Sequence, residues 1–395
     1  MIAINQELQR CKCKGYRGVI GTIISTEGST YQKAGAKCFI SEDGHLTGLV
    51  SGGCVEGDLK EYVHEIIATG LPRIVHYDFK DDGDIVWGLG LGCNGKMNIF
   101  LEPYRPGQNP ENTAMIDAFF SSMLTKPLHR ITIVDSNDTS ILGKTWLVDP
   151  ASKEYPKIPN NEILQDYMVN RHTKKNGLSY IGGNLNLSIF YEFTTPPPNL
   201  IIFGAGPDAI PLVRMAKTLN WPITVLDYRT ALASKQNFPD ADEIIVYPAG
   251  NVPEITINQN SYVILMTHNF MQDQIILEYL LRTDPAYLGV LGPRKRTEEL
   301  INSSDIDSDH PKLSTIHSPV GLDLGSKTPE EIALSILAEI MVTYRGGTGS
   351  RLSEVKGELI FPHHKASPES YMEKDMTPNI DRKSDFQQLL REEVY

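Results

Sequence analysis

Long apolar runs are absent from this 395-residue sequence, in which the longest are only several residues. A helix that spans a bilayer needs about 20 consecutive apolar residues, so we expect no membrane span. The N-terminal stretch MIAINQELQRCKCKG also lacks the apolar core of a signal peptide. We therefore expect a cytoplasmic protein.

Cysteine is scarce and positive charge is in deficit. The five cysteines all lie in the first quarter of the chain, and an odd number without an export signal indicates thiols, not a disulfide framework. The formal net charge of −12 argues against binding of nucleic acid or acidic membranes over the whole surface. With 41% hydrophobic and 22% charged residues the chain has the composition of a soluble protein, and its length leaves room for two domains.

The most informative stretch has the order of a dinucleotide-binding βαβ unit. An apolar run at Leu200 to Phe203 predicts a buried strand, Gly204-Ala205-Gly206 a tight turn, and Ala209 to Leu219 a helix. A second strand at Ile223 to Leu226 ends on Asp227.

Each small residue of this turn has a physical role in such a unit. Gly204 lets the chain bend, Gly206 lets a pyrophosphate approach the backbone, and Ala209 lets helix and strand pack closely. The helix N-terminus favours an anion, and Asp227 is placed to accept hydrogen bonds from ribose hydroxyls. We therefore predict a nucleotide site here, against the alternative that the turn serves packing alone.

The segment Thr194-Thr195-Pro196-Pro197-Pro198 predicts a stiff linker at 194–198. It separates an N-terminal mixed α/β domain at 1–193, which carries the cysteine and glycine loops, from a Rossmann-like doubly wound parallel sheet at 199–346. A polar tail follows at 347–395. The polar, interrupted stretch from about Asp149 to Asn184 is interpreted as a surface excursion or a variable insertion, without assigned chemistry.

Short apolar runs predict the strands of both halves. Before the linker they are Val19 to Ser25, Lys37 to Ser41, Leu46 to Val50 and Met97 to Leu101, with a hairpin turn at Glu42-Asp43-Gly44 and a helix at Val55 to Ala68. After the first two strands of the βαβ unit they are Glu243 to Val246, Tyr262 to Met266 and Tyr287 to Val290.

Two cysteines lie in glycine-rich loops. Cys54 follows Gly52-Gly53 at the start of a predicted helix, where the helix dipole favours a thiolate, and Cys93 follows Gly92 in GLGLGCNGK. Such a pair could coordinate a soft metal, accept or protect sulfur, or face one cofactor. The alternative is that one or both are small buried hydrophobes.

Three cationic residues are further candidates. His268 and Arg294 follow the fourth and fifth predicted parallel strands, so both can reach the crevice beside Gly204. His268 could be an acid, a base or a hydrogen-bond donor, and Arg294 could contact an anion or begin an exposed helix. Lys33, in the loop GSTYQKAG, is available for a phosphate or carboxylate.

Taken together, these motifs resemble the XdhC/CoxI family, the accessory factors that mature xanthine dehydrogenase and related molybdenum hydroxylases. The resemblance covers most of the chain, in the family's order. It is carried by GTIISTEGSTYQKAGAK, VSGGCVEGDL, LGLGCNGKMNIFLEP, IIFGAGPDAIPL, LMTHNFMQD, YLGVLGPRKR and GLDLGSKTPEEIALSILAEI. Asn94 departs from the family's usual GCGG.

The resemblance implies a chaperone that binds molybdenum cofactor, as molybdopterin or its dinucleotide form. It would protect the cofactor while a cysteine desulfurase installs the terminal sulfido ligand, then pass it to the apo molybdenum hydroxylase. Cys54 and Cys93 match the family's cysteines. A homodimer is the default expectation for shielding a labile ligand.

Two rival functions remain open. An NAD(P)-dependent oxidoreductase would hold its dinucleotide at Gly204, Gly206 and Asp227, but the sequence offers it no clear proton-transfer dyad. A redox- or nucleotide-sensing binding module would use the thiols to report oxidation.

Overall fold

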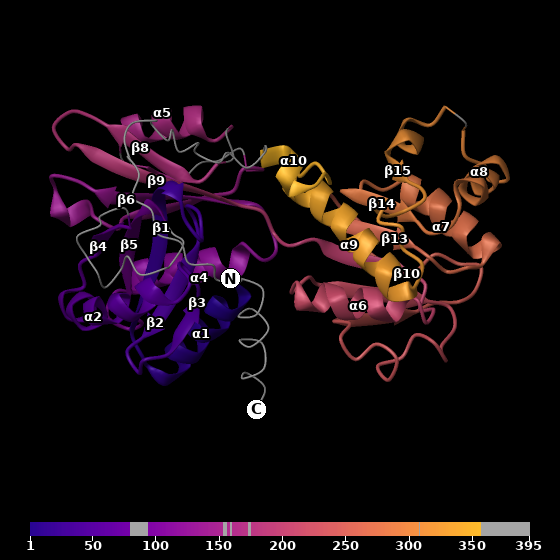
Figure 1. Ribbon diagram of the computed structural model, residues 1–395, viewed down its shortest axis with the longest axis horizontal. Helices are drawn as coiled ribbons and strands as arrows, with labels where there is room; N and C mark the ends of the chain where they lie inside the picture. Colours follow the sequence, from indigo (N-terminus) through magenta and orange to yellow (C-terminus); the bar gives the residue numbers. More distant parts are fainter. Residues whose placement is uncertain (80–93, 153–155, 159, 173–174, 308, 357–395) are drawn as a thin grey trace, which may run out of the picture. The chain divides into compact units, whose positions relative to one another are not determined.

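The computed structural model describes residues 1–79, 94–152, 156–158, 160–172, 175–307 and 309–356. Internal contacts divide the chain into two units, Met1–Gly349 and Ser350–Tyr395. The described part of the second unit contains a short helix, α10 (Leu352–Lys356). All three sheets belong to the first unit (Figure 1).

The first sheet, sheet A, is antiparallel, with strand order β3-β2-β1-β5-β4. Its strands are β1 (Gly18–Ser29), β2 (Lys37–Ser41), β3 (Leu46–Gly48), β4 (Arg73–Asp78) and β5 (Asn94–Tyr104), and its helices are α1 (Ile2–Lys14), α2 (Cys54–Thr69) and α4 (Pro110–Ser122). The predicted hairpin between β2 and β3 is confirmed. The predicted helix α2 is also confirmed, and it ends at Gly70, whose φ of 71° is left-handed.

A second antiparallel sheet, sheet B, has the order β7-β6-β9-β8. It is built from β6 (Leu128–Asp135), β7 (Thr145–Val148), β8 (Gly177–Ile181) and β9 (Leu187–Thr194), with η1 (Thr139–Ile141) and helix α5 (Asn161–Asn170).

The interpretation of Asp149 to Asn184 as a surface excursion was therefore wrong. Strand β8 pairs with β9 from Gly177 to Ile181, and α5 buries Ile163 and Tyr167 in the core of sheet B. Only a few side chains of this segment are buried, and the partner strand comes later in the sequence. Local hydrophobic periodicity therefore carries little signal for this part of the sheet.

Two buried ion pairs join sheets A and B. Lys37 Nζ on β2 lies 2.9 Å from Glu192 Oε2 on β9, and Arg130 Nη2 on β6 lies 2.7 Å from Glu102 Oε2 on β5. Both cations lie over the ring of Phe119 on α4. The four charged side chains are at most 4% exposed, so each pair is removed from water and depends on its partner.

The third sheet, sheet C, is parallel, with the order β12-β11-β10-β13-β14-β15. Numbered from β10, this is the 3-2-1-4-5-6 order of a dinucleotide-binding fold. The strands are β10 (Asn199–Phe203), β11 (Ile223–Asp227), β12 (Glu243–Val246), β13 (Ser261–Leu265), β14 (Tyr287–Val290) and β15 (Ile316–His317).

Helices cover both faces of sheet C (Figure 1). They are α6 (Ala209–Thr218), α7 (Phe270–Leu281), α8 (Arg294–Asn302) and α9 (Pro329–Arg345), with η2 (Pro311–Thr315) before β15. Leu200 and Ile202 of β10 pack with α6 and α9, whereas Ile201 and Phe203 pack with α7. This alternation confirms the predicted doubly wound sheet. In the described part of the chain, no helix combines the length and apolar character needed to cross a bilayer.

Candidate functional site

The predicted glycine turn lies at the carboxyl end of β10. Gly204 has φ 128°, and a Cβ atom built on it would lie 2.2 Å from the carbonyl oxygen of Met266. Only glycine therefore fits this position. The structure brings Gly204, Gly206, Asp227 and His268 together at this edge of sheet C.

Asp227 holds the turn instead of facing solvent. It is 0% exposed, and its Oδ2 accepts hydrogen bonds from Ala205 N at 2.7 Å and Arg229 Nη2 at 2.6 Å. Its Oδ1 accepts from Arg229 N at 2.8 Å and Nε at 2.9 Å. Burial opposes ionisation, but these hydrogen bonds outweigh it and keep the pKa of Asp227 below its usual value. A ribose that binds Asp227 would have to displace Arg229, the residue two positions after it in the sequence.

A carboxylate also lies where a pyrophosphate is expected. A Cβ atom on Gly206 would lie 2.4 Å from Asp208 Oδ1, and Asp208 Oδ2 lies 2.7 Å from His268 Nε2. Pro207 removes one N–H group from the turn. An anion at the N-terminus of α6 would therefore be repelled by the Asp208 carboxylate and would find one backbone N–H donor fewer, because position 207 is proline. Because Asp208 and His268 are 60 residues apart, the sequence did not reveal this pair.

In the basic segment Arg294-Lys295-Arg296, Arg294 points to solvent and not into the crevice. Its side chain is 80% exposed and its Nε lies 3.0 Å from Glu298 Oε1 on the same helix. Arg296 instead donates from Nη2 to Asp273 Oδ2 at 2.6 Å, and Asp273 Oδ1 accepts from Thr267 Oγ1 at 2.5 Å. Arg296, two positions after Arg294 on α8, therefore makes the contact that supports the chain just before His268.

Hydrogen bonds to Glu56 hold the backbone of the first cysteine loop just before its glycines. Gly52 and Gly53 are exposed, Gly53 has φ 113°, and Cys54 is the first residue of α2. Glu56 Oε1 accepts from Val50 N at 2.9 Å and from Ser51 N at 2.7 Å, and these bonds with that of the Ser51 hydroxyl keep the pKa of Glu56 low despite burial.

The backbone position predicted for Cys54 is thus confirmed. Gly92 and Cys93 lie outside the described residues. The residues that are described contain no group of three or more His, Cys, Asp or Glu side chains placed to hold a metal ion. Coordination of a metal by Cys54 and Cys93 stays a prediction.

Alkylation of the native protein at pH 7 is expected to separate the cysteines. Cys38 is buried in the core, and burial raises its pKa to about 12. Burial and the charge of Glu7 raise the pKa of Cys11 to about 11. Both should resist iodoacetamide, whereas exposed Cys13 reacts. Peptide mass spectrometry measures the three rates; equal labelling of Cys38 and Cys13 would contradict this burial.

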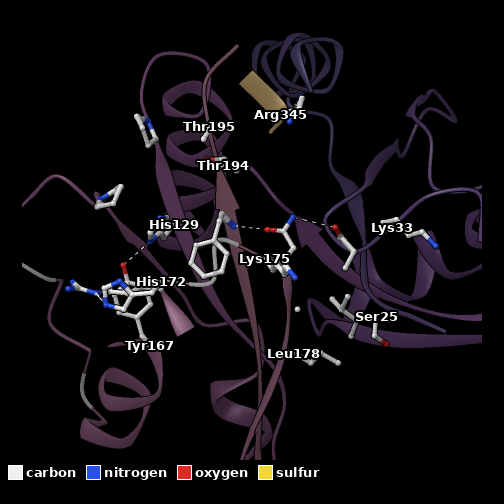
Figure 2. A pocket seen from close by; sticks show the side chains of 18 of the residues that line it. Ser25, Lys33, His129, Tyr167, His172, Lys175, Leu178, Thr194, Thr195 and Arg345 are labelled. Atoms are coloured by element: carbon white, nitrogen blue, oxygen red, sulfur yellow. Dashed lines mark hydrogen bonds between the residues drawn. The ribbon is translucent and has the colours of Figure 1, made fainter. Parts of the chain in front are cut away.

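A cavity of about 1140 Å³ lies elsewhere, beside β1, β9 and the start of β8 (Figure 2). Its basic lining residues are Lys33, His129, Arg171, His172, Lys175 and Arg345. Lys33, singled out in the sequence as an anion contact, does line a cavity. The others were missed because most come from the polar segment after Asp149.

Fold and site together define a protein with a Rossmann-type sheet that follows two antiparallel sheets and a cysteine-bearing glycine turn. Family models match residues 13–78, as the XdhC and CoxI family, and residues 200–340, as the XdhC Rossmann domain. The chain belongs to the XdhC and CoxI family.

Three similar proteins extend these matches. A protein of Bacillus subtilis (strain 168), named as a probable xanthine dehydrogenase subunit, is 31% identical over 82% of this chain and 92% of its own length. The molybdenum cofactor insertion chaperone PaoD of Escherichia coli (strain K12) is 24% identical over 82% of this chain and 83% of its own. A crystal structure described as a xanthine dehydrogenase from Bacillus halodurans is 31% identical, with a TM-score of 0.69 over 89% of this chain and 98% of that one.

Proposed function

We propose that this chain is an accessory factor that binds molybdenum cofactor, protects it during sulfuration and delivers it to a xanthine dehydrogenase-type molybdenum hydroxylase. The similarity to PaoD, a molybdenum cofactor insertion chaperone, supports the insertion role. The observation that carries the proposal is the glycine turn that begins α2 at Cys54 and is held by hydrogen bonds to Glu56.

The donor set of this turn suits a molybdenum dithiolene. A thiolate is a soft ligand, and a cysteine at a helix N-terminus has its anionic form favoured by the dipole. Exposed Gly52 and Gly53 carry no side chain that would keep a ligand from the backbone. When bound, the cofactor supplies the oxygen and sulfur chemistry of its metal. Cys54, and Cys93 as its predicted partner, would hold the metal end.

The Rossmann edge supports dinucleotide binding less well than its sequence suggested. Asp227 is saturated by hydrogen bonds from Ala205 and Arg229, and the Asp208 carboxylate stands over Gly206. Asp208 and His268 form the acid–base pair that the oxidoreductase hypothesis lacked in the sequence, but they do so where its pyrophosphate would bind. We therefore rank NAD(P) chemistry below cofactor insertion. In our proposal Gly204, Gly206 and His268 shape a contact for the cofactor or its recipient.

The partners follow from the proposed task. An apo molybdenum hydroxylase receives the cofactor, and a cysteine desulfurase provides sulfur for the terminal sulfido ligand while the cofactor is bound. We propose a homodimer as the form that shields it, because a labile ligand is protected best when it is enclosed between surfaces.

The test is transfer of molybdenum cofactor to an apo xanthine dehydrogenase-type enzyme, with a cysteine desulfurase and cysteine present. The full-length protein should raise the rate of reconstitution. Cys54→Ser and Cys93→Ser should each lower that gain about tenfold or more, because a hydroxyl is a poor ligand for a soft metal. Cys13→Ser is the matched control, since Cys13 is an exposed cysteine on α1.

Two results would count against the proposal. One is reconstitution at the same rate with and without the protein. The other is tight binding of NADH, seen as enhanced nicotinamide fluorescence, in a protein that binds no pterin cofactor. The second result would make the oxidoreductase the leading function.

A further inference from the structure

The cavity beside sheet B has a lining that is strongly one-sided in charge. Lys33, Arg171, Lys175 and Arg345 supply four formal positive charges, and His129 and His172 add imidazoles. None of the described residues that line it is Asp or Glu. The chain as a whole has a net charge of −12, so the charge of this lining is opposite in sign to that of the protein. A concave site lined by one sign of charge concentrates ligands of the opposite sign.

Lys33 and Lys175 come from two segments that are fixed against each other. Asn176, next to Lys175, donates from Nδ2 to the carbonyl oxygen of Ala34, next to Lys33, at 3.3 Å. Its Oδ1 accepts from Phe193 N at 2.8 Å. A Cβ atom on Gly35 would lie 2.1 Å from Asn176 Nδ2, so the loop can approach this closely only with glycine there. Asn176 thus holds the two lysine-bearing segments in one place before any ligand binds.

One wall of the cavity is aromatic. His129 Nδ1 and the Tyr167 hydroxyl lie 2.8 Å apart, and the ring of Phe193 meets that of His129 at a centroid distance of 4.6 Å. In the view of Figure 2, Tyr167 and His172 lie on one side of the cavity, Ser25 and Lys33 on the other, and Lys175 between them. His129 and Tyr167 are buried, but Phe193 is half-buried and His172 is exposed, so these two rings can meet a ligand. Accessible ring surface with cations beside it suits a planar ring that carries a phosphate.

We infer that this cavity binds a phosphate ester of a planar heterocycle, with Lys33 and Lys175 as contacts to the phosphate. The inference rests on the proposed function only in naming the pterin of molybdenum cofactor as the preferred heterocycle. It also gives the phosphate a place away from the Gly206 turn, where Asp208 opposes an anion.

The test is isothermal titration of the full-length protein with pyrophosphate, GMP and free molybdopterin. Lys33→Gln and Lys175→Gln should each weaken binding of pyrophosphate about tenfold, the usual effect of losing one charge-assisted contact. Binding should also weaken as salt is raised. Lys60→Gln is the matched control, because Lys60 is an exposed lysine on α2. Unchanged thermal melting of each variant shows that folding is intact.

The three probes also separate the sources of the phosphate. Tighter binding of molybdopterin than of GMP identifies a pterin phosphate as the ligand, and the reverse order identifies a nucleotide. Either order supports a phosphate site if Lys33→Gln and Lys175→Gln weaken the binding of both ligands. Equal binding of pyrophosphate by wild type, Lys33→Gln and Lys175→Gln overturns the inference, even if cofactor transfer succeeds. Lysine-dependent binding of pyrophosphate without cofactor transfer leaves the site standing and removes the proposed function.

Discussion

Arg130→Met is expected to lower the free energy of unfolding by about 3–5 kcal/mol, because it leaves Glu102 as a buried charge without its partner. Arg130 Nη2 donates to both carboxylate oxygens of Glu102, at 2.8 and 2.7 Å. Burial disfavours the guanidinium, but the attraction of Glu102 and Glu192 outweighs it and raises the pKa of Arg130. Urea unfolding followed by the fluorescence of Trp146 on β7 reports the loss.

Two controls separate loss of the pair from loss of packing. The double variant Arg130→Met with Glu102→Leu should recover much of the stability, because both buried charges are then gone. Arg73→Met removes a pair with Glu65 whose side chains are 48% and 57% exposed, and should cost less than about 1 kcal/mol. A loss as small as this for Arg130→Met would mean that Glu102 finds water or another donor.

Gly204→Ala is expected to destabilise the Rossmann sheet by about 3 kcal/mol or more, whereas Gly206→Ala should cost much less. At Gly204 the new Cβ atom would meet the backbone oxygen of Met266 at 2.2 Å, in a conformation that other residues rarely adopt. At Gly206 it would meet only the end of the Asp208 side chain, which can rotate away. Thermal melting with Trp221 fluorescence, from the core of this sheet, measures both.

The pair of glycine variants also tests the site. Gly206→Ala should displace Asp208 and so break its hydrogen bond to His268, which a change in the NMR chemical shifts of the His268 ring would reveal. Similar melting temperatures for the two variants would contradict the crowding at Gly204.

Five of the six strands of sheet C could be predicted because each is a short apolar run bounded by turn residues, whereas the two-residue strand β15 (Ile316–His317) was not predicted. Leu200 to Phe203 and Tyr287 to Val290 match β10 and β14 within one residue. Sheet B was predicted poorly, because β8 (Gly177–Ile181) is short and has no fully buried residue, so its pairing with β9 leaves little signal in the local hydrophobic pattern.

Within the candidate site, the sequence indicated positions more reliably than roles. His268 and Asp227 do lie at the carboxyl ends of parallel strands beside Gly204, because the order of a doubly wound sheet requires it. Their partners were not foreseen: Arg229 occupies the carboxylate of Asp227, and Asp208 pairs with His268. Side-chain partners depend on rotamers and distances, which residue spacing does not contain.

The sequence by itself determined the Rossmann-type βαβ unit, the helix that begins at Cys54 and the family, because these depend on local patterns of apolar, small and capping residues. Only the tertiary structure decided which charges meet. It buried Lys37 and Arg130 against Glu192 and Glu102, placed Asp208 over Gly206, and brought Lys33 to the same cavity as Lys175. Most of these arrangements join residues far apart in the chain, and only the packing of whole sheets brings such residues within a few ångströms of one another.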